Sequence, residues 1–240
     1  MIKTLLFDLD DTLLPLNVDF FLQHYFRSLT ARFAELVPPK QLIAQIMRAT
    51  EAMIRNNDRT KTNQQVFTED FFRDFPRPAE EIMPLFDEFY ANEFPKLREY
   101  AGNNPAARMA LEAAVAKGYD LVVATNPVFP RQAIMERLRW AQVDDFSFQL
   151  ITAYEEMHFC KPNPAYYYEI LELLQLKPEE CLMIGNDVEE DLAARTLGIK
   201  TFLVEDFLLN PKGIAYETDY RGRLVDLVGF IRQELPTLNR

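Results

Sequence analysis

The sequence predicts an α/β protein, a doubly wound parallel sheet that is interrupted after its first strand by a helical segment. Short apolar runs bounded by polar residues, as at 2–7 and 181–185, are typical of buried strands. In the second half of the chain such runs alternate with helical periodicity, which is the order of a parallel sheet with crossover helices. We therefore expect an α/β core of residues 1–15 and 99–240 and an all-helical domain of residues 16–98.

Each element follows from a local pattern. The predicted strands are residues 2–7, 119–125, 148–152, 181–185 and 201–204. Apolar residues at steps of three and four predict the helices of the helical segment at 18–37, 41–54, 64–75 and 79–94. The same spacing predicts core helices at 106–117, 130–140, 164–176, 188–197 and 223–235. Proline pairs and Gly118 mark helix ends, and Asn163 is a predicted N-cap.

Composition limits the class of protein. Hydrophobic residues make up 48% of the 240 residues and charged residues 26%, as in an ordinary globular protein. The net charge is 26 − 37 = −11, which disfavours nucleic acid and anionic membrane as partners. We expect no membrane span, because no apolar run approaches about 18 residues, and no signal peptide, because acids interrupt the first apolar run. A monomer or weak homodimer is the default expectation.

Cysteine usage predicts a reducing compartment. The only two cysteines, Cys160 and Cys181, cannot form a disulfide framework or a zinc quartet. We expect them to be half-buried thiols of a cytoplasmic protein. Phosphate-binding glycine motifs and the G-x-S-x-G motif of serine hydrolases are absent from the sequence.

Polar residues follow four of the predicted strands, where an open parallel sheet binds its ligands. They are Asp8, Asp10, Asp11 and Thr12 after the first strand, Thr125 and Asn126 after the second, Lys161 past the third, and Asn186, Asp187 and Asp191 after the fourth. Asp8 and Asp10 are two residues apart in an extended segment and can face one site. Asp187 and Asp191 are four apart in a predicted helix and can face it too.

Several carboxylates at one place repel each other unless a cation lies among them. Hard oxygen ligands in an open, hydrated site favour Mg²⁺ as the cofactor. Lys161 adds a mobile positive charge for a phosphate or a nucleophilic carboxylate. This composition suits phosphoryl transfer, in which positioning and charge neutralisation provide most of the catalysis.

These residues, in this order, resemble the haloacid dehalogenase superfamily. The resemblance rests on FDLDDTLL at 7–14, ATN at 124–126, CKPNPAYY at 160–167 and IGNDVEED at 184–191. It covers the whole chain, and the long interval between the first two motifs resembles members with a helical cap at the first insertion point. Such a cap closes over the site and selects small soluble substrates.

The resemblance implies a role for each motif residue. Asp8 would be the nucleophile that forms an aspartyl-phosphate, and Asp10 the general acid and base. Thr125, with the amide of Asn126, would bind the transferring phosphoryl group, and Lys161 would stabilise both the phosphoryl group and the nucleophile. Mg²⁺ would be held by Asp8, the main-chain carbonyl of Asp10 and an acid of the fourth motif.

The fourth motif departs from the usual Gly-Asp. Gly185 is followed by Asn186, and the acid comes one position later. Either Asp187 holds the metal while Asp191 orients a bound water, or Asn186 occupies the metal position and Asp191 binds. Asp11 is expected to be a solvated turn residue.

The predicted function is a Mg²⁺-dependent phosphatase that acts on a small phosphate monoester, of the nucleotide, sugar phosphate or phosphoglycolate type. A 2-haloacid dehalogenase is the first alternative, although the resembling dehalogenases lack an acid at the position of Asp10. A module that binds a phosphorylated ligand without turnover is the second. Aromatic residues of the first helix, Phe20, Phe21, Tyr25 and Phe26, are expected to pack in the cap, and one or two of them could touch the leaving group.

Overall fold

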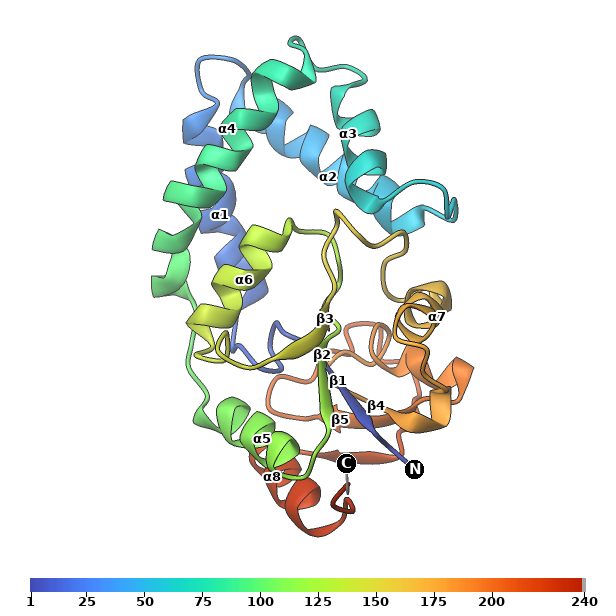
Figure 1. Cartoon of the computed structure of the whole chain (residues 1–240). Helices are drawn as coiled ribbons and strands as arrows, with labels where there is room; N and C mark the ends of the chain where they lie inside the picture. The colour runs from blue at the N-terminus through green and yellow to red at the C-terminus, as the bar shows by residue number, and fades with distance from the viewer. Residues whose placement is uncertain (239–240) are drawn as a thin grey trace.

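A computed structural model, which describes residues 1–238, has a six-stranded parallel sheet (Figure 1). The strand order is β3-β2-β1-β4-β5-β6, with β1 at Thr4–Phe7, β2 at Asp120–Val123, β3 at Phe148–Ile151, β4 at Cys181–Gly185, β5 at Lys200–Val204 and β6 at Tyr220–Gly222. The predicted doubly wound α/β fold is confirmed. Strand β6 was not predicted, because its three residues are only partly buried or exposed and form no apolar run.

The central strand β1 shows how the two faces of the sheet are formed. It pairs with β2 and β4 along its whole length. Side chains alternate across a strand, so Leu5 and Phe7 pack in the hydrophobic cluster on one face and Leu6 in that on the other. Because both faces are covered, the strands are continuous apolar runs.

Helices cover both faces of the sheet. Helices α5 (Pro105–Ala116) and α8 (Leu224–Gln233) pack against each other on one face. Helix α7 (Pro164–Leu173) and the 3₁₀ segment η3 (Leu192–Leu197) contact each other and belong to the opposite cluster. A short 3₁₀ turn, η2 (Pro178–Glu180), precedes β4.

A helical insert lies between β1 and α5 and stands over one edge of the sheet (Figure 1). We use this name for α1 (Val18–Arg32), α2 (Pro39–Arg55), α3 (Asn63–Phe72), α4 (Ala79–Asn92) and the 3₁₀ segment η1 (Phe94–Tyr100). Helix α1 ends five residues earlier than predicted. Helix α4 ends at Asn92, two residues earlier than predicted, and the 3₁₀ segment η1 begins at Phe94.

Helix α6 (Arg131–Trp140) connects the core with the insert. It contacts α4 and η1, and Trp140 stacks on Phe94 of η1 with ring centroids 5.2 Å apart. The insert and α6 therefore share one hydrophobic cluster.

The predicted helix at 188–197 is wrong in its first part. Residues 188–191 form a turn, and only η3 is helical. The Asp187 side chain accepts hydrogen bonds from the amides of Glu189 and Glu190, at 2.7 and 2.8 Å. Such side-chain bonds satisfy backbone donors outside a helix and so compete with helix formation.

Two further expectations concern compartment. Both cysteines are free and fully buried, rather than half-buried. No helix in the described part of the chain is long and apolar enough to cross a membrane.

Candidate active site

A cavity of about 460 Å³ lies between the carboxyl ends of the strands and the helical insert. Its lining includes nearly all the residues that the sequence analysis singled out: Asp8, Asp10, Thr125, Asn126, Asn186, Asp187 and Asp191. The parallel strands bring these side chains together because their carboxyl ends share one edge of the sheet. Lys161 does not line the cavity and lies behind Asp8.

Lys161 joins two carboxylates. Its Nζ lies 2.9 Å from Asp8 Oδ1 and 2.6 Å from Asp191 Oδ1, and its side chain is fully buried. Burial opposes the charge of this lysine, but Asp191 and Asp8 outweigh burial and hold its pKa well above the usual value. Burial is also the main cause that raises the pKa of Asp8, and the Lys161 ammonium opposes it. One buried cation thus serves two acids, and the site has a deficit of positive charge.

Gly185 allows Asp191 to reach this position. A Cβ atom on Gly185 would lie 2.0 Å from Asp191 Oδ2, which no side chain could accommodate. The glycine of the fourth motif is therefore required for the close approach of the carboxylate that pairs with Lys161.

Asp10 pairs with Arg137, a residue that the sequence analysis did not consider. A guanidinium nitrogen of Arg137, in α6, forms an ion pair with Asp10 Oδ2, and the Arg137 side chain is 2% exposed. Arg137 lies on the buried face of α6 with Ile134 and Leu138. A cation at apolar helical spacing was the available signal for this buried ion pair.

The loop after β1 is fixed from two sides. Thr12 Oγ1 donates to Asn186 Oδ1 at 3.0 Å, which ties the first motif to the fourth. Asp11 has a left-handed backbone (φ 57°), and its carboxylate accepts the Leu16 amide at 2.7 Å. The expectation that Asp11 is solvated is wrong, because only 7% of it is exposed. Burial raises the pKa of Asp11 to about 6.

Thr125 and Asn126 are held by a polar network. The Thr125 carbonyl accepts the hydroxyls of Thr152 and Tyr166, at 2.7 and 2.9 Å. Asn126 Oδ1 accepts the Lys161 amide at 3.2 Å, and Asn126 Nδ2 donates to Glu190 at 2.9 Å. This network links the second, third and fourth motifs, and Glu190 was not predicted to belong to it.

The three candidates of the fourth motif have different partners. Both carboxylate oxygens of Asp191 accept hydrogen bonds, Oδ1 from the Lys161 ammonium and Oδ2 from the Asp187 backbone amide at 2.9 Å. Asn186 is held by Thr12 and by the Phe207 carbonyl, to which its Nδ2 donates at 2.7 Å. Asp187 accepts hydrogen bonds from the backbone amides of Glu189 and Glu190, both through Oδ1.

The donor chemistry of the cavity suits Mg²⁺. Among the described residues, no three acidic, histidine or cysteine side chains are clustered to hold a metal. A Mg²⁺ ion needs no such cluster, since one or two carboxylates, a carbonyl, water and a substrate phosphate complete its shell. Asp8, Asp10 and Asp187 line the same cavity and provide hard oxygen donors.

The sequence matches the haloacid dehalogenase-like hydrolase family over residues 2–198. The chain belongs to this family of hydrolases.

Individual relatives of this hydrolase differ in chemistry. A pyrophosphatase PpaX from Bacillus cereus is 24% identical over 240 residues, which is 100% of this chain and 99% of the relative. A 2-haloacid dehalogenase from Pseudomonas syringae superposes with a TM-score of 0.64 at 21% identity, over 98% of this hydrolase and all of that chain. A haloacid dehalogenase-like (HAD) hydrolase from Bacillus subtilis with bound magnesium has a TM-score of 0.55 at 21% identity, over 97% of this hydrolase and 99% of that chain. The two structures share the fold of this hydrolase, so the reaction must be argued from its own site.

Proposed function

We propose that this hydrolase is a Mg²⁺-dependent phosphatase that releases phosphate from a small phosphate monoester. The observation that carries the proposal is that Asp8 and Asp10 face one cavity while Lys161 contacts Asp8 from behind. The PpaX relatives, named pyrophosphatases, also favour phosphoryl chemistry. An acid at Asp10 favours phosphatase over dehalogenase chemistry, because an alkoxide leaving group needs a proton and a halide does not.

The proposed reaction has two steps, formation and hydrolysis of a phosphoryl-Asp8 intermediate. An Asp8 carboxylate oxygen attacks phosphorus, and the bond from phosphorus to the leaving oxygen breaks as Asp10 delivers a proton to that oxygen. Asp10, now ionised, takes a proton from water, whose oxygen attacks the phosphoryl group and releases Asp8. Thr125 and the Asn126 amide bind the phosphoryl oxygens, and Lys161 balances the charge of Asp8.

Mg²⁺ would be held by Asp8, the main-chain carbonyl of Asp10 and Asp187. When bound, it supplies positive charge for the phosphoryl oxygens. We favour Asp187 over Asp191 because both oxygens of Asp191 are already engaged. Asp191 then orients Lys161 and the loop that carries Asp187.

The helical insert is proposed to act as the cap of the site. It supplies much of the cavity wall, including Leu22, Phe26 and Phe67. Closing it over a bound ester would exclude water and strengthen the electrostatics of the site.

The test is phosphate release from para-nitrophenyl phosphate in Mg²⁺ and in EDTA. We expect metal-dependent release by the wild type and loss of at least about 1000-fold for Asp8→Asn, because an amide cannot act as the nucleophile. Asp144→Asn, an exposed position, is the matched control and should retain activity. Unchanged release by Asp8→Asn would contradict the proposal.

A further inference from the structure

The insert side of the cavity is apolar and aromatic. Four helices contribute to it, with Leu22 and Phe26 from α1, Ile46 from α2, Phe67 from α3 and Met83 from α4. Aromatic packing holds the wall in place, since Phe67 stacks on Phe71 with ring centroids 5.5 Å apart. A leaving group in contact with this wall gains by burying apolar surface.

The cavity has no free cation for a second anionic group. Within residues 1–238, no lysine or arginine lines it. The two cations that contact the predicted catalytic and metal-binding acids are already paired. Lys161 pairs with Asp8 and Asp191, and Arg137 pairs with Asp10.

Acids are present where a second anion would need a partner. Asp87 and Glu155 line the cavity in addition to the carboxylates of the motifs. Both oxygens of Glu155 accept the Arg131 amide at 3.0 Å, so this carboxylate is fixed in place. A second anionic group on the substrate would lose water, gain no counter-charge and meet these acids.

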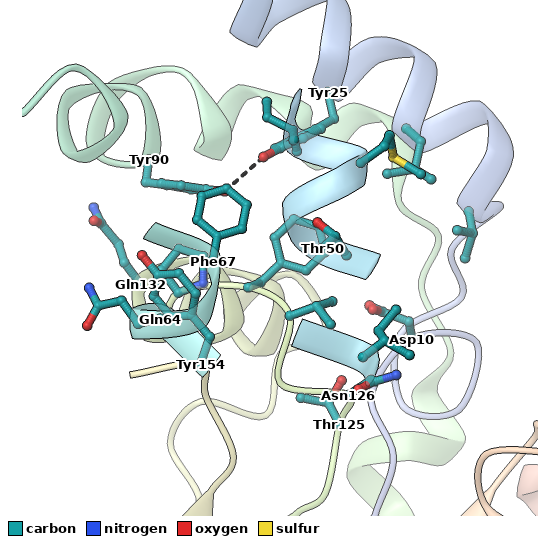
Figure 2. Close-up of a pocket in the computed structure, with 18 of the residues that line it drawn as sticks. Asp10, Tyr25, Thr50, Gln64, Phe67, Tyr90, Thr125, Asn126, Gln132 and Tyr154 are labelled. Carbon is teal, nitrogen blue, oxygen red and sulfur yellow. Dashed lines mark hydrogen bonds between the residues drawn. The ribbon is translucent and has the colours of Figure 1, made fainter. Parts of the chain in front are cut away.

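Uncharged polar groups lie away from the reacting end. Figure 2 shows Gln64, Gln132 and Tyr154 together on one side, with Asp10 and Thr125 on the other. These side chains offer amide and hydroxyl groups, which pair with neutral polar atoms of a ligand. On the insert side of the cavity, Tyr25 of α1 and Tyr90 of α4 form a hydrogen bond through their hydroxyls at 2.8 Å.

We propose that the substrate is a phosphate monoester whose leaving group is an uncharged ring system with a neutral polar group at its far end. This inference rests on the proposed phosphatase function and specifies its substrate class. The phosphoryl group would be the only charge of the substrate. Pyrophosphate, phosphoglycolate and other esters with a second anion would be poor substrates, in contrast to the pyrophosphatase activity for which the PpaX relatives are named.

A pair of esters of nearly equal size tests this substrate class. The first is 4-carbamoylphenyl phosphate, whose amide is neutral, and the second is 4-carboxyphenyl phosphate, whose carboxylate is charged. We expect the wild type in Mg²⁺ to favour the amide ester by about 100-fold in kcat/KM, and to hydrolyse phosphoglycolate and pyrophosphate at least as poorly as the carboxylate ester. Equal rates for the pair, or a preference for the carboxylate ester, would overturn the inference.

A variant with an added cation tests whether contacts in this cavity cause the preference for the amide ester over the carboxylate ester. Gln132 is an exposed residue at the rim, in the first turn of α6. Gln132→Lys should reduce the preference for the amide ester about 10-fold, whereas Gln132→Glu, of nearly equal size, still accepts a hydrogen bond from the ligand amide and repels a carboxylate, so it should retain or increase the preference. A preference that Gln132→Lys leaves unchanged would contradict the assignment of the leaving group to this cavity.

Binding separates this inference from the proposed function. If the wild type hydrolysed no ester, the phosphatase proposal would fail. Calorimetric binding of the two intact esters to Asp8→Asn in Mg²⁺ would then decide the inference alone. Tighter binding of the amide ester by at least about 10-fold supports it, and equal or reversed affinity rejects it.

Discussion

Arg137 forms an ion pair with one oxygen of Asp10 and fixes the orientation of the carboxylate. The guanidinium pairs with Oδ2, while Oδ1 is buried without a hydrogen-bond partner among the described residues. The same guanidinium lies over the ring of Phe129, 4.6 Å from its centroid, which fixes its position. We infer that Arg137 orients the Asp10 carboxylate and is a positioning residue.

The first prediction concerns this ion pair. Arg137→Met should lower kcat by at least about 10-fold, since Asp10 loses its orientation, with a smaller effect on KM. It should also cost about 3–5 kcal/mol of stability, because a partly buried carboxylate loses its partner. Steady-state kinetics and denaturant unfolding measure the two effects.

Arg137→Lys separates the two effects. It keeps the charge but not the planar fork, so it should recover stability more than kcat. Full kcat in a folded Arg137→Met protein would show that Asp10 does not depend on Arg137.

The second prediction distinguishes the acids of the fourth motif. Asp187→Asn should raise the Mg²⁺ concentration for half-maximal activity by about 10- to 100-fold, with kcat largely recovered at saturating metal. Asp191→Asn should lower kcat at every Mg²⁺ concentration, because Lys161 loses its 2.6 Å partner. The reverse pattern would assign the metal to Asp191. Titration of activity with Mg²⁺ is the measurement.

The third prediction links metal and pH. Without metal, burial raises the pKa of Asp8 from 3.8 to about 8. Between these values the folded protein holds a proton that the unfolded chain has released, so metal-free stability should fall as the pH rises. Mg²⁺ requires the ionised carboxylate, so its stabilising effect should grow over the same range.

Thermal midpoints in Mg²⁺ and in EDTA test this link. The difference between the two midpoints should be larger at about pH 8 than at about pH 6. Asp8→Asn should remove this pH dependence. Equal metal shifts at both pH values in the wild type would refute the link.

The fourth prediction concerns the contact between the insert and the core at Asn63. This residue is fully buried, and its amide nitrogen reaches the carbonyls of Pro127 and Phe159, at 3.3 and 3.4 Å. Its backbone amide donates to the Met157 carbonyl at 2.8 Å. The start of α3 is thus tied to the segment that leads to Lys161.

Asn63→Ala should lower the free energy of unfolding by about 1–3 kcal/mol, because buried carbonyls lose a donor. Urea unfolding measures this change. Asn92→Ala, at an exposed position of α4, is the control and should cost less than about 0.5 kcal/mol. Equal costs for the two variants would show that Asn63 does not tie the insert to the core.

The sequence by itself determined five of the six strands of the sheet and the order of the motifs. The apolar runs at β1 and β4 and the acids that follow them are local patterns, and parallel topology places strand ends at one edge. Where local side chains compete with the backbone for hydrogen bonds, the predicted helix does not form, as in the turn at 188–191. There the Asp187 carboxylate satisfies amides that a helix would otherwise use.

Only the tertiary structure decided which distant residues meet. Arg137 pairs with Asp10, and Asn63 of the insert bonds to the core, although these partners are far apart in the sequence. The cavity wall, which has no lysine or arginine among the described residues, is likewise built from distant segments. Periodicity reports which face of a helix is buried, but not what that face contacts. The chemistry of the acids was therefore predictable from the chain, whereas the positioning of Asp10 and the character of the leaving-group cavity required the packed fold.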